Sequence, residues 1–232
     1  MGRPAALAVL ALAALAPVPA PAAGPACHCF RDREYDPANP AASDAYLLAT
    51  SSNSLLAAVA GIPKRDIVQA LMTGTAGADL WIAAHAARRR GGDVRAVLQA
   101  RAGTVSWREL FRAGGGDLEA LGPRFVAALA SGADDATLAR IAAAEALAER
   151  AGTPWGQLDA LAARGATYQE TVAATLIGRW AGKEATEVFD AARGAAGWSS
   201  QLAAAGLVPK AVEGNILRLL ATPQAPPGGA AR

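Results

Sequence analysis

The stretch GGDVRAVLQARAGTVSW, residues 91–107, predicts the fold when it is compared with GKEATEVFDAARGAAGW, residues 182–198. Each stretch begins with a glycine, has a valine six residues later and ends on a tryptophan ten residues after that valine. Gly91 and Gly182 are 91 positions apart, and the two tryptophans keep the same offset. A constant offset between glycines and aromatic residues predicts an internal duplication that repeats an apolar framework rather than a set of reactive side chains.

A shorter period lies inside this repeat. Four glycines are spaced 30, 61 and 30 residues apart, namely Gly61, Gly91, Gly152 and Gly182. An aromatic residue stands sixteen positions after three of them, namely Trp107, Tyr168 and Trp198. Gly77 occupies the corresponding position after Gly61. We interpret the 30-residue unit as one helical hairpin, with chance periodicity in an alanine-rich helical chain as the alternative.

Helix start signals explain these aromatic residues without any reference to function. The sequences Ser-Trp-Arg-Glu at 106–109 and Thr-Tyr-Gln-Glu at 167–170 both match the capping box, which makes the aromatic the first residue inside the helix. Such a residue is placed to cover a small core, so we expect Trp107 and Trp198 to be buried. Period-two patterns rich in β-branched residues are missing, so no strand is expected.

The sequence therefore predicts an all-α protein formed by tandem duplication of a roughly 91-residue multi-helix unit, built from helical hairpins of about 30 residues. The expected segments are a signal peptide at 1–26, an extended arm with cysteines at 27–43, a first copy at 44–130, a second copy at 131–221 and a disordered tail at 222–232. Hydrophobic residues make up 53% of the chain and aromatic residues 5%, so small side chains should allow close helix packing. We expect two similar bundles stacked on each other.

The first 26 residues have the form of a signal peptide, because a single charge at Arg3 precedes the apolar run Ala5–Ala16. That run is shorter than the roughly 20 residues that span a bilayer core, so no membrane span is expected in the mature chain. We expect export to the periplasm or secretion, with lipidation at Cys27 as the alternative. Without Arg3 the chain has 21 basic and 20 acidic residues, a balance that argues against nucleic acid as a partner.

Cys27, His28 and Cys29 form the one constellation of reactive atoms at close spacing. Two thiolates and an imidazole can hold a soft metal, or the thiols can form a redox disulfide. A structural zinc site takes four ligands, however, and the only other histidine is His85, which we interpret as a packing or helix-surface residue. The alternative is an incidental pair of cysteines beside a processed N-terminus, with no cofactor.

Three further stretches have an ordinary structural interpretation beside a functional one. The hydroxyl-rich stretch Thr50–Ser54 has no histidine or lysine near it in sequence, so we favour helix packing over a nucleophile. Arg88–Arg90 are expected at a solvated helix end, where cations are favourable, rather than in an anion site. Residues 106–129 superficially resemble a helix-turn-helix, but the second helix offers Arg124 as its one basic residue.

The Cys-His-Cys-Phe sequence after a signal peptide, a helix bearing Asn53 and Ser54, and hairpins with the order Gly, Val-Leu, Gly, Trp are similar to an uncharacterised group of exported bacterial all-helical repeat proteins. The resemblance covers most of the mature chain and implies no named activity. We expect a non-enzymatic envelope protein that has a structural role or binds a protein partner through a helix face or groove. The alternatives are metal handling or thiol redox chemistry at the arm, and a hydrolase with a scattered site.

Overall fold

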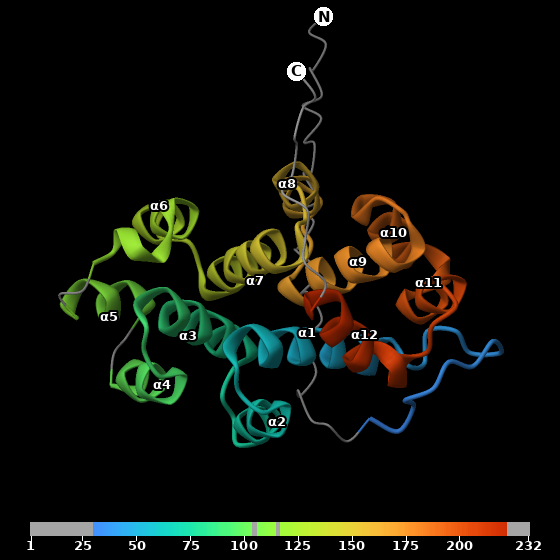
Figure 1. Cartoon of the computed structure of the whole chain (residues 1–232), viewed down its shortest axis with the longest axis horizontal. Helices are drawn as coiled ribbons and strands as arrows, with labels where there is room; N and C mark the ends of the chain where they lie inside the picture. Colours follow the sequence, from blue (N-terminus) through green and yellow to red (C-terminus); the bar gives the residue numbers. More distant parts are fainter. Residues whose placement is uncertain (1–29, 104–105, 115–116, 222–232) are drawn as a thin grey trace, which may run out of the picture.

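The computed structural model describes residues 30–103, 106–114 and 117–221, and every regular element in these ranges is helical (Figure 1), which confirms the all-α prediction. The first six α-helices are α1 (Asp44–Ala60), α2 (Lys64–Met72), α3 (Gly77–Arg90), α4 (Val94–Ala102), α5 (Trp107–Ala113) and α6 (Pro123–Ser131). The other six are α7 (Asp135–Ala151), α8 (Trp155–Ala163), α9 (Tyr168–Ala181), α10 (Ala185–Ala191), α11 (Trp198–Ala204) and α12 (Val212–Ala221). Three short helical turns complete the described part of the fold. Two are 3₁₀ turns, η1 (Glu119–Leu121) and η3 (Pro209–Ala211), and one is a π turn, η2 (Ala192–Ala196).

The helix starts follow a regular spacing. Helices α1 to α5 begin at residues 44, 64, 77, 94 and 107, and α7 to α11 begin at 135, 155, 168, 185 and 198, which is 91 residues later in each case. The helices that precede Gly61, Gly91, Gly152 and Gly182 all end on that glycine in the left-handed conformation, with φ between 63° and 71°. Glycine adopts this conformation without the steric cost that a Cβ atom imposes, so it is the usual helix stop.

Four long helices, α1, α3, α7 and α9, form the centre of the molecule (Figure 1). Helix α3 packs along α7, and α1 packs along α9, so each half of the chain contributes one helix to each of these contacts. The expectation of two similar bundles stacked on each other does not describe these two contacts, in which helices of residues 44–130 pack directly on helices of residues 131–221. Buried alanines along α3 and α7 permit this close approach, because they place little volume between the helix backbones.

The aromatic residues of the repeat lie where the sequence predicted. Trp107 and Trp198 are 1% and 5% exposed, which confirms their expected burial, and Tyr168 is half-buried. The Trp107 indole N–H donates to Asp79 Oδ1 at 2.8 Å. Gly77 has a steric reason to lack a side chain, because a Cβ atom there would clash with the Tyr168 hydroxyl.

The described part of the N-terminal arm lies on the helical body. The Phe30 ring meets the Tyr46 ring edge to face at 5.8 Å, and Glu34 pairs with Lys210. At the end of the arm, the Asp44 carboxylate accepts hydrogen bonds from the first two backbone N–H groups of α11 at 2.9 and 2.7 Å. The arm therefore joins the beginning of the described chain to its C-terminal elements.

Candidate functional sites

The predicted metal or redox residues Cys27, His28 and Cys29 lie outside the described residues. Glu34, a carboxylate in the arm that follows them, is engaged by Lys210. In the part of the chain that the structure describes, no group of three or more histidine, cysteine, aspartate or glutamate residues is placed to hold a metal ion. The metal interpretation of the arm stays a prediction.

The hydroxyl-rich stretch of α1 is buried along its whole length, from Thr50 to Ser54. Ser52 accepts a hydrogen bond from the Trp81 indole N–H at 3.0 Å, and Thr50 accepts one from Lys64 Nζ at 2.9 Å. Lys64 Nζ also donates to Glu213 Oε2 at 2.8 Å, so this side chain bridges the hydroxyl of α1 and a carboxylate of α12. Thr50 and Ser52 are thus hydrogen-bonded packing groups of a central helix, whereas the buried Ser54 Oγ has no hydrogen-bond partner among the described residues. The burial of the stretch agrees with the favoured packing interpretation.

The three arginines at the end of α3 do not lie at a freely solvated helix end, so that expectation is corrected. Arg88 and Arg89 both pair with Glu149 on α7, and Arg89 also donates to Glu145 at 2.7 Å. Arg90 lies over the Phe111 ring at 5.3 Å. These contacts could not be predicted from the sequence, because the acidic partners lie about sixty residues away and meet α3 only through the α3–α7 packing.

His85 lies one turn before these arginines and is 3% exposed, so it is a packing residue rather than a surface one. Its ring stacks on Phe125 with centroids 4.6 Å apart, and its Nε2 lies 2.9 Å from the carbonyl oxygen of Leu121. The carboxylate of Glu145 is also buried, with Oε2 3.8 Å from His85 Nε2. This cluster joins α3, α7, η1 and α6 and is closed to solvent, so it is suited to controlling packing rather than to turning over a substrate.

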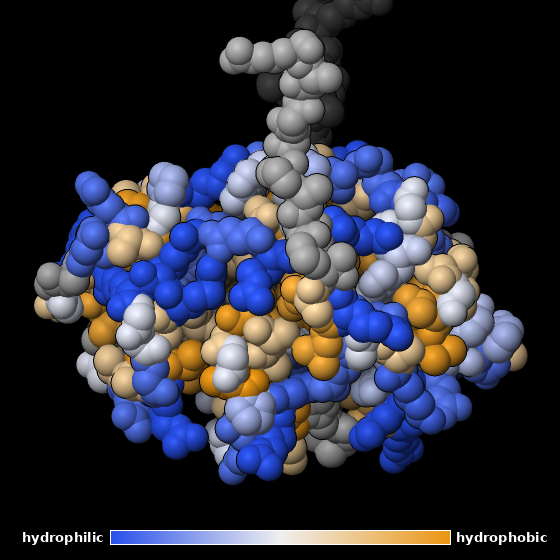
Figure 2. All heavy atoms as spheres, viewed as in Figure 1, coloured by the Kyte–Doolittle hydropathy of each residue, from blue (hydrophilic) through white to orange (hydrophobic). Residues whose placement is uncertain are grey.

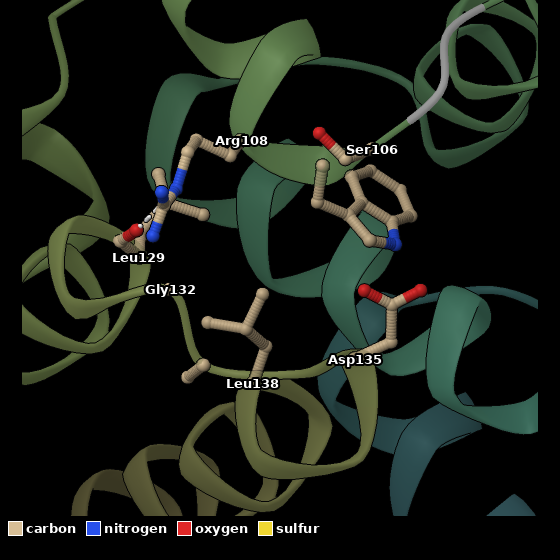
Figure 3. Close-up of a pocket in the computed structure, with 8 residues that line it drawn as sticks. Ser106, Arg108, Leu129, Gly132, Asp135 and Leu138 are labelled. Atoms are coloured by element: carbon tan, nitrogen blue, oxygen red, sulfur yellow. Dashed lines mark hydrogen bonds between the residues drawn. The ribbon is translucent and has the colours of Figure 1, made fainter.

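A small open hollow of about 230 Å³ lies between the beginnings of α5 and α7 (Figure 3). Its lining consists of Ser106, Trp107, Arg108, Leu129, Gly132, Ala133, Asp135 and Leu138. Arg108 and Asp135 lie on opposite sides of it, but Arg108 donates to the carbonyl oxygens of Leu129 and Ala130 at 2.9 and 3.2 Å. The Asp135 carboxylate oxygen Oδ2 lies 3.5 Å from Arg101 Nη2. The charged groups of the hollow are thus engaged within the protein.

The structure does not support the helix-turn-helix interpretation. Arg124, the basic residue of the second helix, pairs with Asp159 at 2.7 Å and lies over the Trp155 ring at 4.0 Å. Both partners belong to α8, so this side chain is used to dock α6 against α8. No helix among the described residues is both long and apolar enough to cross a membrane.

The face formed by α2 and α4, here called the α2–α4 face, is the best candidate for binding another protein. Both helices lie on the same side of α3 in Figure 1, and Figure 2 shows hydrophobic surface in the region between them. Met72 at the end of α2 is 61% exposed, and Leu71, Val97 and Leu98 are half-buried. Large hydrophobic side chains that are left partly exposed at neighbouring positions are typical of interaction sites.

Helices α8 and α10, which begin 91 residues after α2 and α4, are packed differently. Helix α8 packs against α10, α7 and α9, whereas among the described elements the main partner of α2 is α1. On α10, Val188 and Phe189 are 1% and 3% exposed, while the residues 91 positions earlier, Val97 and Leu98, are half-buried. The sequence did not reveal this difference, because both pairs are equally hydrophobic.

No protein-family model matches this chain, and the searches of curated proteins and of solved structures found no match either.

Proposed function

We propose that this chain is an exported, non-enzymatic helical protein, built by duplication of a 91-residue unit, that binds a helical segment of a protein partner. The equal offsets of the ten helix starts support the duplication. The contacts support it too: exchanging the two halves turns the α1–α9 contact into the α7–α3 contact. A twofold axis relates two units in this way, because it places each unit on the other, as in a symmetric dimer.

The single observation that carries the binding function is the uncovered α2–α4 face. In the other half, α8 packs against α10, and Leu158 and Leu161 of α8 are 3% and 0% exposed. Ile67 and Ala70 stand at the matching positions of α2, and the shorter alanine side chain fills less space. The element that suits the open face is therefore an amphipathic helix with an aliphatic stripe, bound as an added helix against α4.

Site-specific photo-crosslinking in the native host tests this function. A photoreactive phenylalanine analogue is placed at Met72, on the α2–α4 face, and in a matched control at Leu217, which is 54% exposed on α12. We expect a discrete adduct from position 72 and none from position 217, with the crosslinked partner peptide mapping to an amphipathic helix. Adding Leu98→Asp should abolish the adduct, because a charge on the face opposes burial of an aliphatic stripe.

Adducts of equal yield at both positions would mean non-specific contact, and the absence of any adduct at position 72 would contradict the proposal. Circular dichroism of each variant, compared with the unmodified chain, checks that the substitutions leave the fold intact.

A further inference from the structure

The neutral His85 ring is held in a single tautomer by its neighbours. Its Nε2 lies 2.9 Å from the Leu121 carbonyl oxygen, which can only accept, so Nε2 carries the proton and donates. The lone pair of the neutral ring is then on Nδ1, which is buried and has no hydrogen-bond partner among the described residues. The ring therefore ties η1 to α3 through its hydrogen bond, and ties α6 to α3 through its stacking on Phe125.

The charged groups around this ring come from two helices. Helix α3 contributes Arg88 and Arg89, and α7 contributes Glu145 and Glu149. The Leu121 carbonyl of η1 and the Phe125 ring of α6 also face the His85 ring, and both groups are uncharged. A proton added at Nδ1 would thus create a third cation beside Arg88 and Arg89. The new Nδ1–H group would also be a buried donor without an acceptor. Glu145 and Glu149 would partly offset the added charge.

We propose that His85 is an acid-operated latch, which fastens η1 and α6 to the α3–α7 core at neutral pH and releases them when Nδ1 takes up a proton. The latch is local, because its hydrogen bond and its stacking contact both involve the segment 119–131. In the other half, Leu176 stands 91 positions after His85 and cannot titrate. The segment 209–221, which contains η3 and α12, should therefore stay closed under the same conditions.

The sign of the pH effect follows from the pKa of the buried ring. Burial, reinforced by Arg88 and Arg89 and opposed by the hydrogen bond to Leu121, lowers the pKa of His85 from 6.5 to about 4. The opened state takes up the proton more readily than the closed state. The contribution of His85 to the free energy that favours the closed state is therefore complete above pH 6.5 and is lost as the pH falls toward 4. With these two values, the ratio of opened to closed molecules rises about 30-fold between pH 7.5 and pH 5.

Glu145 acts in the opposite direction. Burial raises its pKa, against the lowering effect of Arg89, so acid relieves the cost of keeping this carboxylate ionised in the closed state. A Glu145→Gln variant removes this opposing contribution and should make the acid release of segment 119–131 larger than in the unmodified chain.

Hydrogen exchange measured by mass spectrometry on the full chain tests the latch. Exchange in peptides covering 119–131 and 209–221 is measured at pH 7.5 and pH 5, with the intrinsic pH dependence of exchange removed. We expect protection of 119–131 to fall by up to about 30-fold, which is the value for His85 without the opposing effect of Glu145, while protection of 209–221 changes little. The matched variant is His85→Gln, whose amide N–H₂ can still donate to Leu121 but does not titrate in this range, and it should show no fall.

Equal loss of protection in both segments, an unchanged 119–131 segment, or the same loss in His85→Gln would overturn the latch. A second measurement does not depend on that variant folding: an NMR titration of the His85 ring in a His28→Ala chain, which leaves one histidine signal. A pKa well below 6.5 with the proton on Nε2 supports the latch, and a pKa at or above 6.5 overturns it.

Discussion

The clearest stability prediction concerns Gly77, the first residue of α3. A Cβ atom at this position would lie far inside contact distance of the Tyr168 hydroxyl oxygen, 3.4 Å from Tyr168 Cζ and 3.8 Å from Leu71 Cδ2. The tyrosine cannot easily move aside, because its ring packs against Trp81 with centroids 6.5 Å apart. Gly77→Ala should therefore force a shift at the contact between the two halves.

The magnitude follows from two opposing contributions. Overpacking of a close contact costs about 1–3 kcal/mol, whereas replacing glycine by alanine in a helix gains up to about 1 kcal/mol. We expect Gly77→Ala to lower the free energy of unfolding by about 1–2 kcal/mol. Tyr168→Phe removes the clashing oxygen, so the double variant should recover most of the loss and show a coupling energy of about 1–2 kcal/mol.

Urea denaturation measures these values, provided that the slope of free energy against urea stays constant among the variants. The control is Gly156→Ala near the start of α8, where an added Cβ meets nothing within 4 Å and φ is not positive. That substitution should leave stability unchanged or raise it by up to about 1 kcal/mol. If Gly77→Ala is as stable as Gly156→Ala, or if Tyr168→Phe fails to rescue it, the steric account of this glycine is wrong.

Other predictions concern the core, a helix cap and the arm. Trp107→Ala and Trp198→Ala should each cost about 3–5 kcal/mol in urea denaturation because both indoles are buried, and an unchanged midpoint for either would contradict that. Asp44→Ala should cost about 0.5–2 kcal/mol by removing the acceptor for the first two N–H groups of α11, a loss that Asp44→Asn should reduce. Metal analysis of the purified, processed protein should find no stoichiometric zinc or copper. Binding of one equivalent that disappears in a Cys27→Ser, Cys29→Ser double variant would instead assign a metal site to the arm.

Local signals in the sequence predicted the helix ends well. The four regularly spaced glycines stand at helix ends, and Thr167 forms the complete capping box with Glu170, with hydrogen bonds of 2.9 and 3.2 Å. At Ser106 the hydroxyl accepts from the backbone N–H of Glu109, as the same motif predicts. These features depend on residues three or four positions apart, so the sequence alone contains all the information that they need.

Contacts between helices that are far apart in the sequence could not be predicted in the same way. The pair of Arg89 with Glu145 and the hydrogen bond of Trp81 with Ser52 join residues 56 and 29 positions apart. Each pair depends on which helix faces lie together, and the periodicity of an alanine-rich helix defines that face weakly, because alanine is tolerated both inside and outside a core. For this reason the sequence did not show that the acidic neighbours of His85, Glu145 and Glu149, come from α7.

The contact between Gly77 and Tyr168 also limits how alike the two copies of the proposed duplication can be at this pair of positions. These residues are 91 positions apart, and under the proposed duplication they are each other's counterparts, so their contact lies near the twofold axis. Two tyrosines cannot occupy the space of one, so sterics exclude a tyrosine at both of these positions. Away from the axis no such requirement applies. The differences between Leu98 and Phe189, and between His85 and Leu176, are thus free to follow function, and they coincide with the open α2–α4 face and the proposed latch.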